Sequence, residues 1–161
     1  MTTVYLSAGS NIGDRKAHLQ EAVDILKTKK NIRHVVVSGL YQTEPVGPVV
    51  QDDFLNIAVR LETDLEPTEL LTLLHQIELA GKRERVIHWG PRTIDLDIIW
   101  FGTDVIDTAE LQVPHAEMAN RLFGLAPLLE VVSEQRRQEV EGLIQATTDV
   151  KQVERIGEFW G

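Results

Sequence analysis

Cysteine is absent from this sequence of 161 residues. The chain therefore has no disulfide and no thiolate ligand for a metal, which excludes disulfide-stabilised secreted domains and Cys-based zinc sites. No apolar run approaches the roughly 20 residues that a membrane-spanning helix needs. The first ten residues, MTTVYLSAGS, lack the basic and apolar regions of a secretory signal. We therefore expect a cytoplasmic protein that does not act on a membrane.

Positive charge is also in deficit, with 16 Lys and Arg residues against 25 Asp and Glu residues and a formal net charge of −9. This balance argues against nucleic acid as a partner, because non-specific nucleic-acid binding depends on Lys and Arg. Four basic residues nevertheless gather in one stretch, which contains Lys82, Arg83, Arg85 and Arg92. Such a patch can attract an anion to a protein that is acidic elsewhere.

The apolar pattern predicts one domain over residues 1–161, which we expect to be monomeric. Predicted strands cover 3–9, 32–42, 54–62 and 93–101, and predicted helices cover 14–29, 67–80 and 134–146. The first six of these elements follow the order β-α-β-β-α-β. That order is typical of an α+β, ferredoxin-like fold, with an antiparallel sheet and both helices on one face. The remainder is expected to be a C-terminal extension that is irregular over 103–128.

Two aspartates in the fourth predicted strand carry the strongest chemical signal. Residues two apart share one face of a strand, so Asp95 and Asp97 lie together, opposite Leu96. We expect their face to be free of helices and to include Phe54 and Asn56 from the third strand. Carboxylates whose Cα atoms are about 7 Å apart suit one or two hard cations. Alternating aspartates can also simply solvate the outer face of a sheet.

Other candidate residues allow two interpretations each. Three aromatic residues can stack on a flat ligand or pack in the core: Phe54, Trp89 and Phe123. The Asn56 amide can pair with the edge of a heterocycle or with a neighbouring strand. The basic stretch over 82–92 can bind phosphate or remain solvated. His115, which is followed by Arg121, can contact phosphate or be structural.

Several segments together resemble one enzyme family. Arg83-x-Arg85, followed by WGPRTIDLDI over residues 89–98, looks like the signature of the hydroxymethyldihydropterin pyrophosphokinases. Further segments agree with this family in order and spacing: GSN over 9–11, YQTEPVGP over 41–48, FLN over 54–56 and VPHAEMANRLF over 113–123. The resemblance runs from residue 1 to about residue 130.

The resemblance implies transfer of pyrophosphate from ATP to 6-hydroxymethyl-7,8-dihydropterin, which gives AMP and the pterin diphosphate in folate biosynthesis. It implies two Mg²⁺ ions on Asp95 and Asp97, and catalytic phosphate contacts from Arg83 and Arg92. The residues implied for pterin binding are Thr43, Val46, Phe54, Asn56, Trp89 and Phe123. Those implied for ATP binding are Glu78, Arg85, Ile98, His115 and Arg121.

Two functions of other classes stay open beside this one. A metal-dependent phosphohydrolase could use the same two carboxylates, and a ferredoxin-like module could bind a ligand without catalysis. The net charge of −9 argues against RNA as the ligand of such a module. The long, charged loop over 81–92 is also expected to move and to become ordered over ATP.

Overall fold

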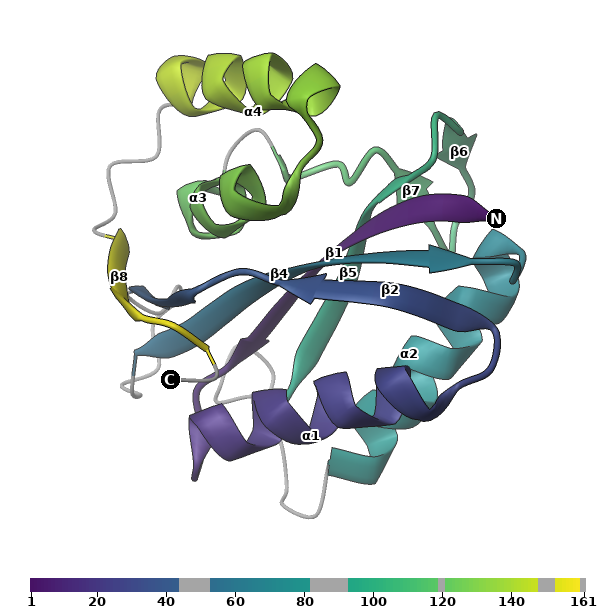
Figure 1. Ribbon diagram of the computed structural model, residues 1–161, viewed down its shortest axis with the longest axis horizontal. Helices are drawn as coiled ribbons and strands as arrows, with labels where there is room; N and C mark the ends of the chain where they lie inside the picture. The colour runs from purple at the N-terminus through teal and green to yellow at the C-terminus, as the bar shows by residue number, and fades with distance from the viewer. Residues whose placement is uncertain (44–52, 82–92, 119–120, 148–152, 160–161) are drawn as a thin grey trace.

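The computed structural model describes residues 1–43, 53–81, 93–118, 121–147 and 153–159 (Figure 1). The helices are α1 (Arg15–Thr28), α2 (Pro67–Gly81), α3 (Leu122–Val131) and α4 (Glu134–Ala146). The strands are β1 (Thr2–Ser10), β2 (Ile32–Val37), β3 (Leu40–Thr43), β4 (Phe54–Thr63), β5 (Asp95–Phe101), β6 (Ile106–Asp107), β7 (Gln112–Val113) and β8 (Val153–Gly157). Within the described ranges, no helix combines the length and the apolar character needed to cross a membrane.

Six strands of the described chain form one sheet in the order β5-β1-β4-β3-β8, and β2 also pairs with β4. Every pair of neighbours is antiparallel, as predicted. β6 and β7 form a separate two-stranded sheet. β1 and β4 are central, so each is held by partners on both of its edges.

One face of the sheet is covered by α1 and α2, which lie below it in Figure 1. Leu19 of α1 and Leu74 of α2 are fully buried, in one core cluster with Ile57 of β4. Helical spacing and strand alternation both predict these residues to face inward. α1 begins after Asp14, whose Oδ1 accepts a hydrogen bond from Ala17 N at 3.1 Å and so caps the helix.

The opposite face is partly covered by α3 and α4, so the prediction of a helix-free face is wrong (Figure 1). Leu125 and Leu128 of α3 form a second core cluster with Trp100 of β5. Arg60 Nη1, on β4, donates to Val131 O at 2.9 Å. The sheet face that carries the aspartates is therefore covered over part of its area by packed helices.

The sequence patterns predict neither α3 nor β8. α3 begins inside the segment over 103–128 that was expected to be irregular, because Gly124 and Pro127 interrupt its apolar residues. Its remaining side chains are almost all apolar, so no polar face marks the helical period. β8 is only VERIG, too short and too polar to be recognised without its partner β3.

The predicted second strand, 32–42, is divided into β2 and β3 at Ser38 and Gly39. Ser38 N donates to Ala58 O at 2.9 Å, and Ala58 N donates to Ser38 Oγ at 2.9 Å. The serine hydroxyl therefore takes the place of a backbone acceptor at the break. A second irregularity of β2 contains His34, whose φ is 53°. Beyond the break, β3 pairs with both β4 and β8.

Candidate functional site

One row of residues crosses the sheet near the end of β1. From β5 to β8, the Cα atoms of Asp95, Gly9, Asn56, Tyr41 and Arg155 are paired in register. Residues directly opposite one another on antiparallel strands present their side chains to the same face. The expected metal-binding aspartate and the expected pterin-binding amide therefore share one face, with Gly9 between them.

The two aspartates lie on the face of β5 that points away from α1 and α2, as strand parity predicts. Asp95 is exposed, and the side chain of Asp97 is 46% exposed. Leu96 and Ile98 alternate with them and are buried in the core beneath the sheet. The Ile98 side chain is thus turned away from the aspartates, so only its backbone is available for the predicted ATP contact.

The donors at Asp95 and Asp97 suit a hard divalent cation. Mg²⁺ prefers oxygen ligands and is usually held by one or two carboxylates, with water and phosphate oxygens completing the shell. In the part of the chain that the structure describes, no three His, Asp or Glu side chains are placed to hold a metal ion. Most ligands of a cation here would therefore come from water or from a bound phosphate.

His115 approaches Asp97 from the segment after β7. Its Nε2 lies 3.7 Å from Asp97 Oδ1, and its side chain is 21% exposed. Its Nδ1 accepts a hydrogen bond from Glu117 N at 3.1 Å, and its backbone N donates to Ile99 O at 3.1 Å. Because Nδ1 is an acceptor, neutral His115 carries its proton on Nε2, facing Asp97. The structure brings this histidine to the aspartates, and its contact with ATP stays a prediction.

Glu78 reaches β5 from α2. Its Oε2 accepts a hydrogen bond from Leu96 N at 2.9 Å, between the two aspartates in sequence. Burial raises the pKa of the Glu78 carboxyl, the hydrogen bond from Leu96 opposes this rise, and the charge of Asp95 adds to it. Glu78 therefore fixes the strand that presents the aspartates, while its predicted ATP contact stays untested.

Asn56 and Thr43 form a polar edge on β4 and β3. Asn56 is 2% exposed, and its Nδ2 donates to Thr43 Oγ1 at 2.8 Å. Its Oδ1 lies over Gly9, where an added Cβ atom would be only 2.8 Å away. Phe54, which is half-buried, lies beside the same glycine. The amide thus has one fixed orientation, which recognition of a heterocycle edge requires.

The first residues of α3 stand over β1, next to the aspartates. An added Cβ on Gly124 would be 3.9 Å from Ser7 Oγ, and the Cα of Ser7 pairs with that of Asp97. Arg121 is the N-cap residue of α3, and its guanidinium carbon lies 5.8 Å from the centroid of the Phe123 ring. Arg121 and Phe123 are therefore brought to the face of the sheet that carries Asp97.

The remaining predicted site residues lie outside the described ranges: Val46, Arg83, Arg85, Trp89 and Arg92. The predicted movement of the loop over 81–92 falls almost wholly outside them as well.

Three neighbours of the site were missed by sequence reasoning. Gly9 is the last residue of the predicted strand over 3–9 and by itself indicates only the turn that follows, although a glycine in a strand can also signal the close approach of another group. Glu130 lies just beyond the last motif and Arg155 lies far from it in sequence, and no pattern in a single sequence pairs the two. Their contacts are visible only in the folded chain.

Comparison of the sequence with known proteins finds relatives of this chain. Residues 5–133 match the family model described as 7,8-dihydro-6-hydroxymethylpterin-pyrophosphokinase (HPPK). The chain is 53% identical over 133 residues to the bifunctional protein FolKE of Lactococcus lactis subsp. cremoris, which covers 83% of the chain and 38% of that protein. It is 49% identical over 127 residues to 2-amino-4-hydroxy-6-hydroxymethyldihydropteridine pyrophosphokinase of Bacillus subtilis, which covers 79% of the chain and 76% of that protein.

A solved structure supports the fold. The chain is similar to the HPPK-DHPS of Plasmodium falciparum, with a TM-score of 0.64 and 14% identity over 90% of the chain and 43% of that protein. At this identity the likeness concerns the fold alone. The chain thus spans less than half of the bifunctional relatives and about three quarters of the Bacillus subtilis protein.

Proposed function

Because the chain belongs to the 7,8-dihydro-6-hydroxymethylpterin-pyrophosphokinase family, we propose that it transfers pyrophosphate from ATP to 6-hydroxymethyl-7,8-dihydropterin. The products are AMP and the pterin diphosphate, in folate biosynthesis. We assign this activity to a cytoplasmic monomer with a single domain over residues 1–161. We also interpret β1 to β5, with α1 and α2, as a ferredoxin-like core.

One observation carries the proposal: one of the two carboxylates, that of Asp95, shares a row of the sheet with a fixed amide, that of Asn56. Asp95 and Asn56 both pair with Gly9. Neighbouring strands are about 5 Å apart, so the Cα atoms of Asp95 and Asn56 are separated by about 10 Å. A pterin bound at Asn56, with its hydroxymethyl group directed along the row, would present its alcohol to phosphates held near Asp95.

The pterin end of this site is built for a flat, polar-edged ring. Asn56 Oδ1 accepts from the ring edge, and its Nδ2 is kept in place by Thr43. Phe54 and Phe123 supply aromatic surface on either side of the ring. Val46 and Trp89 complete the proposed pterin contacts.

The phosphate end combines carboxylates and cations. Asp95 and Asp97 would hold two Mg²⁺ ions, which when bound neutralise charge on the phosphate oxygens. Arg83 and Arg92 would donate to the transferring phosphates. The remaining ATP contacts are assigned to Glu78, Arg85, Ile98, His115 and Arg121.

The reaction is a displacement at phosphorus. The pterin hydroxymethyl oxygen forms a bond to the β-phosphorus of ATP, and the bond from that phosphorus to the oxygen shared with the α-phosphate breaks. AMP leaves with the bonding electrons, and the alcohol proton passes to water. The contribution of the protein is to align the two substrates and to stabilise charge, which is the main source of catalysis in phosphoryl transfer.

Asp95→Asn tests the assignment. Asp95 is exposed, so the variant should fold and melt as the unchanged protein does. Its rate of AMP formation from ATP, with Mg²⁺ and pterin present, should fall about 100-fold or more. Asp24→Asn is the matched control, because Asp24 lies on the exposed side of α1 and contacts Gln20. Near-normal turnover by Asp95→Asn would refute the assignment.

The two alternatives give different products. A phosphohydrolase would release phosphate or pyrophosphate whether or not pterin is present. A non-catalytic module would bind ligand without consuming ATP. AMP that appears only when pterin is present, and that a chelator abolishes, excludes both.

A further inference from the structure

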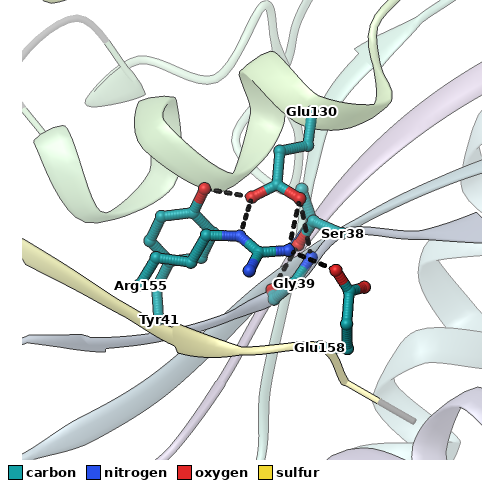
Figure 2. Close-up of polar contacts among 7 residues, drawn as sticks. Ser38, Gly39, Tyr41, Glu130, Arg155 and Glu158 are labelled. Carbon is teal, nitrogen blue, oxygen red and sulfur yellow. Dashed lines mark hydrogen bonds and ion pairs between the residues drawn. The ribbon is translucent and has the colours of Figure 1, made fainter. Parts of the chain in front are cut away.

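Glu130, near the end of α3, accepts hydrogen bonds from two separate segments, the start of β3 and β8 (Figure 2). Its carboxylate accepts hydrogen bonds from the Tyr41 hydroxyl, from Gly39 N at 3.0 Å, and from Arg155 Nε at 3.0 Å and Nη2 at 3.3 Å. We call these four residues the Glu130 cluster. The Glu130 side chain is 28% exposed, so these contacts are partly shielded from water.

Arg155 brings β8 into the Glu130 cluster. Its guanidinium lies so close to Gly39 that an added Cβ there would be 2.4 Å from Nη2, so a larger residue would displace the arginine. The Nη2 that donates to Glu130 also donates to Glu158 Oε1 at 2.9 Å (Figure 2). The fork geometry of arginine makes this a directional contact between β8 and α3.

The Glu130 cluster connects the two sides of the proposed pterin site, which are the Asn56–Thr43 edge beside β3 and Phe123 on α3. Tyr41 pairs directly with Asn56, and Thr43, two residues along β3, accepts the hydrogen bond from Asn56. On the α3 side, Glu130 and Phe123 are seven residues apart, which places them on the same helix face about 10 Å apart along the axis. A carboxylate bound to Tyr41 therefore fixes α3 relative to β3.

We propose that Tyr41 and Arg155, acting through Glu130, are positioning residues that set the spacing between Phe123 and the Asn56–Thr43 edge for the pterin ring. The inference rests on the proposed function and adds residues to it. β8 lies beyond residues 5–133, the part that matches the family model, so the chain supports its pterin site from outside that region.

Steady-state kinetics of the full-length chain test this role. Tyr41→Phe and Arg155→Ala should each raise the KM for 6-hydroxymethyl-7,8-dihydropterin about tenfold, as expected when one charge-assisted hydrogen bond is lost from positioning. The KM for ATP should change less than about threefold, because Arg121, at the start of α3, is the one proposed ATP contact on an element that the Glu130 cluster holds. Arg155→Lys, which keeps the charge but not the fork, should recover part of the loss.

A double variant separates positioning from mere stability. Tyr41→Phe and Arg155→Ala act through the same carboxylate, so their effects on the pterin KM should be less than additive. Arg136→Ala is the matched control. Arg136 is on α4, away from the Glu130 cluster. Its Nη2 donates to Gly102 O at 2.7 Å, and its guanidinium stacks on Trp100 of β5. It should lower the melting temperature without changing the pterin KM.

The outcomes are distinct. A selective, non-additive rise in the pterin KM supports the inference. Lower melting temperatures with both KM values unchanged, or equal rises in both, would overturn it and leave the proposed function standing. No pterin-dependent AMP from the unchanged protein would overturn the proposed function and this inference together.

Discussion

At the scale of single residues, the site depends on the absence of a side chain at Gly9. Asn56 is buried, with Nδ2 bound to Thr43 and Oδ1 over Gly9. The backbone of Gly9 does not need a positive φ, so it is the approach of Asn56 that requires glycine there.

Gly9→Ala should therefore act on pterin binding. An added Cβ 2.8 Å from Asn56 Oδ1 would force the amide to turn, because the neighbouring backbone of β1 is held on both edges. We expect the pterin KM to rise about tenfold or more, while the ATP KM stays close to normal. Initial rates of AMP formation measure both constants. An unchanged pterin KM would mean that the Asn56 orientation does not matter.

Glu130 predicts how stability depends on pH. Burial alone would raise the pKa of its carboxyl, but hydrogen bonds from Arg155, Tyr41 and Gly39 together hold the pKa below its usual value. A carboxyl whose pKa is lower in the folded state contributes stability that is fully present above the unfolded pKa. That contribution is lost as the pH falls through the folded pKa.

Glu130→Gln should thus be less stable than the unchanged protein at neutral pH, by about 1–3 kcal/mol. The difference should begin to narrow once the pH falls below about 4.5, where the unfolded chain takes up a proton, and should close as the pH falls through the lower pKa of the folded Glu130 carboxyl. Urea unfolding of both proteins across this range is the measurement. A difference that stayed constant or grew on acidification would contradict the assigned contacts.

At the scale of elements, α4 packs on α3 and lies behind the site rather than in it. Gly142 is exposed within α4, and among the described residues no atom outside its chain neighbours and the adjoining helix backbone lies within 4 Å of the Cβ that alanine would add. Gly142→Ala should raise the free energy of unfolding by about 1 kcal/mol, because glycine is a poor helix former. Denaturant unfolding measures this gain. Both KM values should stay unchanged, which makes the variant a control for Gly9→Ala. A loss of stability would contradict the open surroundings of Gly142.

Sequence patterns predict a helix or strand when one of its faces is apolar and the other is polar. They fail when both faces have the same polarity. α1 and β4 have clear apolar and polar sides, so their inward residues were predicted correctly. α3 is apolar almost throughout, with Gly124 and Pro127 inside it, so its period is concealed. β8 depends on pairing with β3 and on Arg155, and such long-range contacts leave no local signal.

At the scale of the whole molecule, the proposed chemistry lies on one face of the sheet, beside the second core cluster under α3 and α4. The face under α1 and α2 holds the main core, and the opposite face holds both the aspartates and the Asn56 edge. Parity within strands predicted that the aspartates and Asn56 would share a face. Parity could not predict that Gly9 aligns Asp95 with Asn56 in one row, or that α3 packs over this face, because register and packing depend on distant segments.

The mass of the pterin recovered after incubation with ATP and Mg²⁺ tests the central claim most directly. The account predicts 6-hydroxymethyl-7,8-dihydropterin with two added phosphoryl groups, formed in equal amount to AMP and only when Mg²⁺ is present. Unmodified pterin beside consumed ATP would contradict it, and so would a pterin carrying a single phosphoryl group with ADP as the second product.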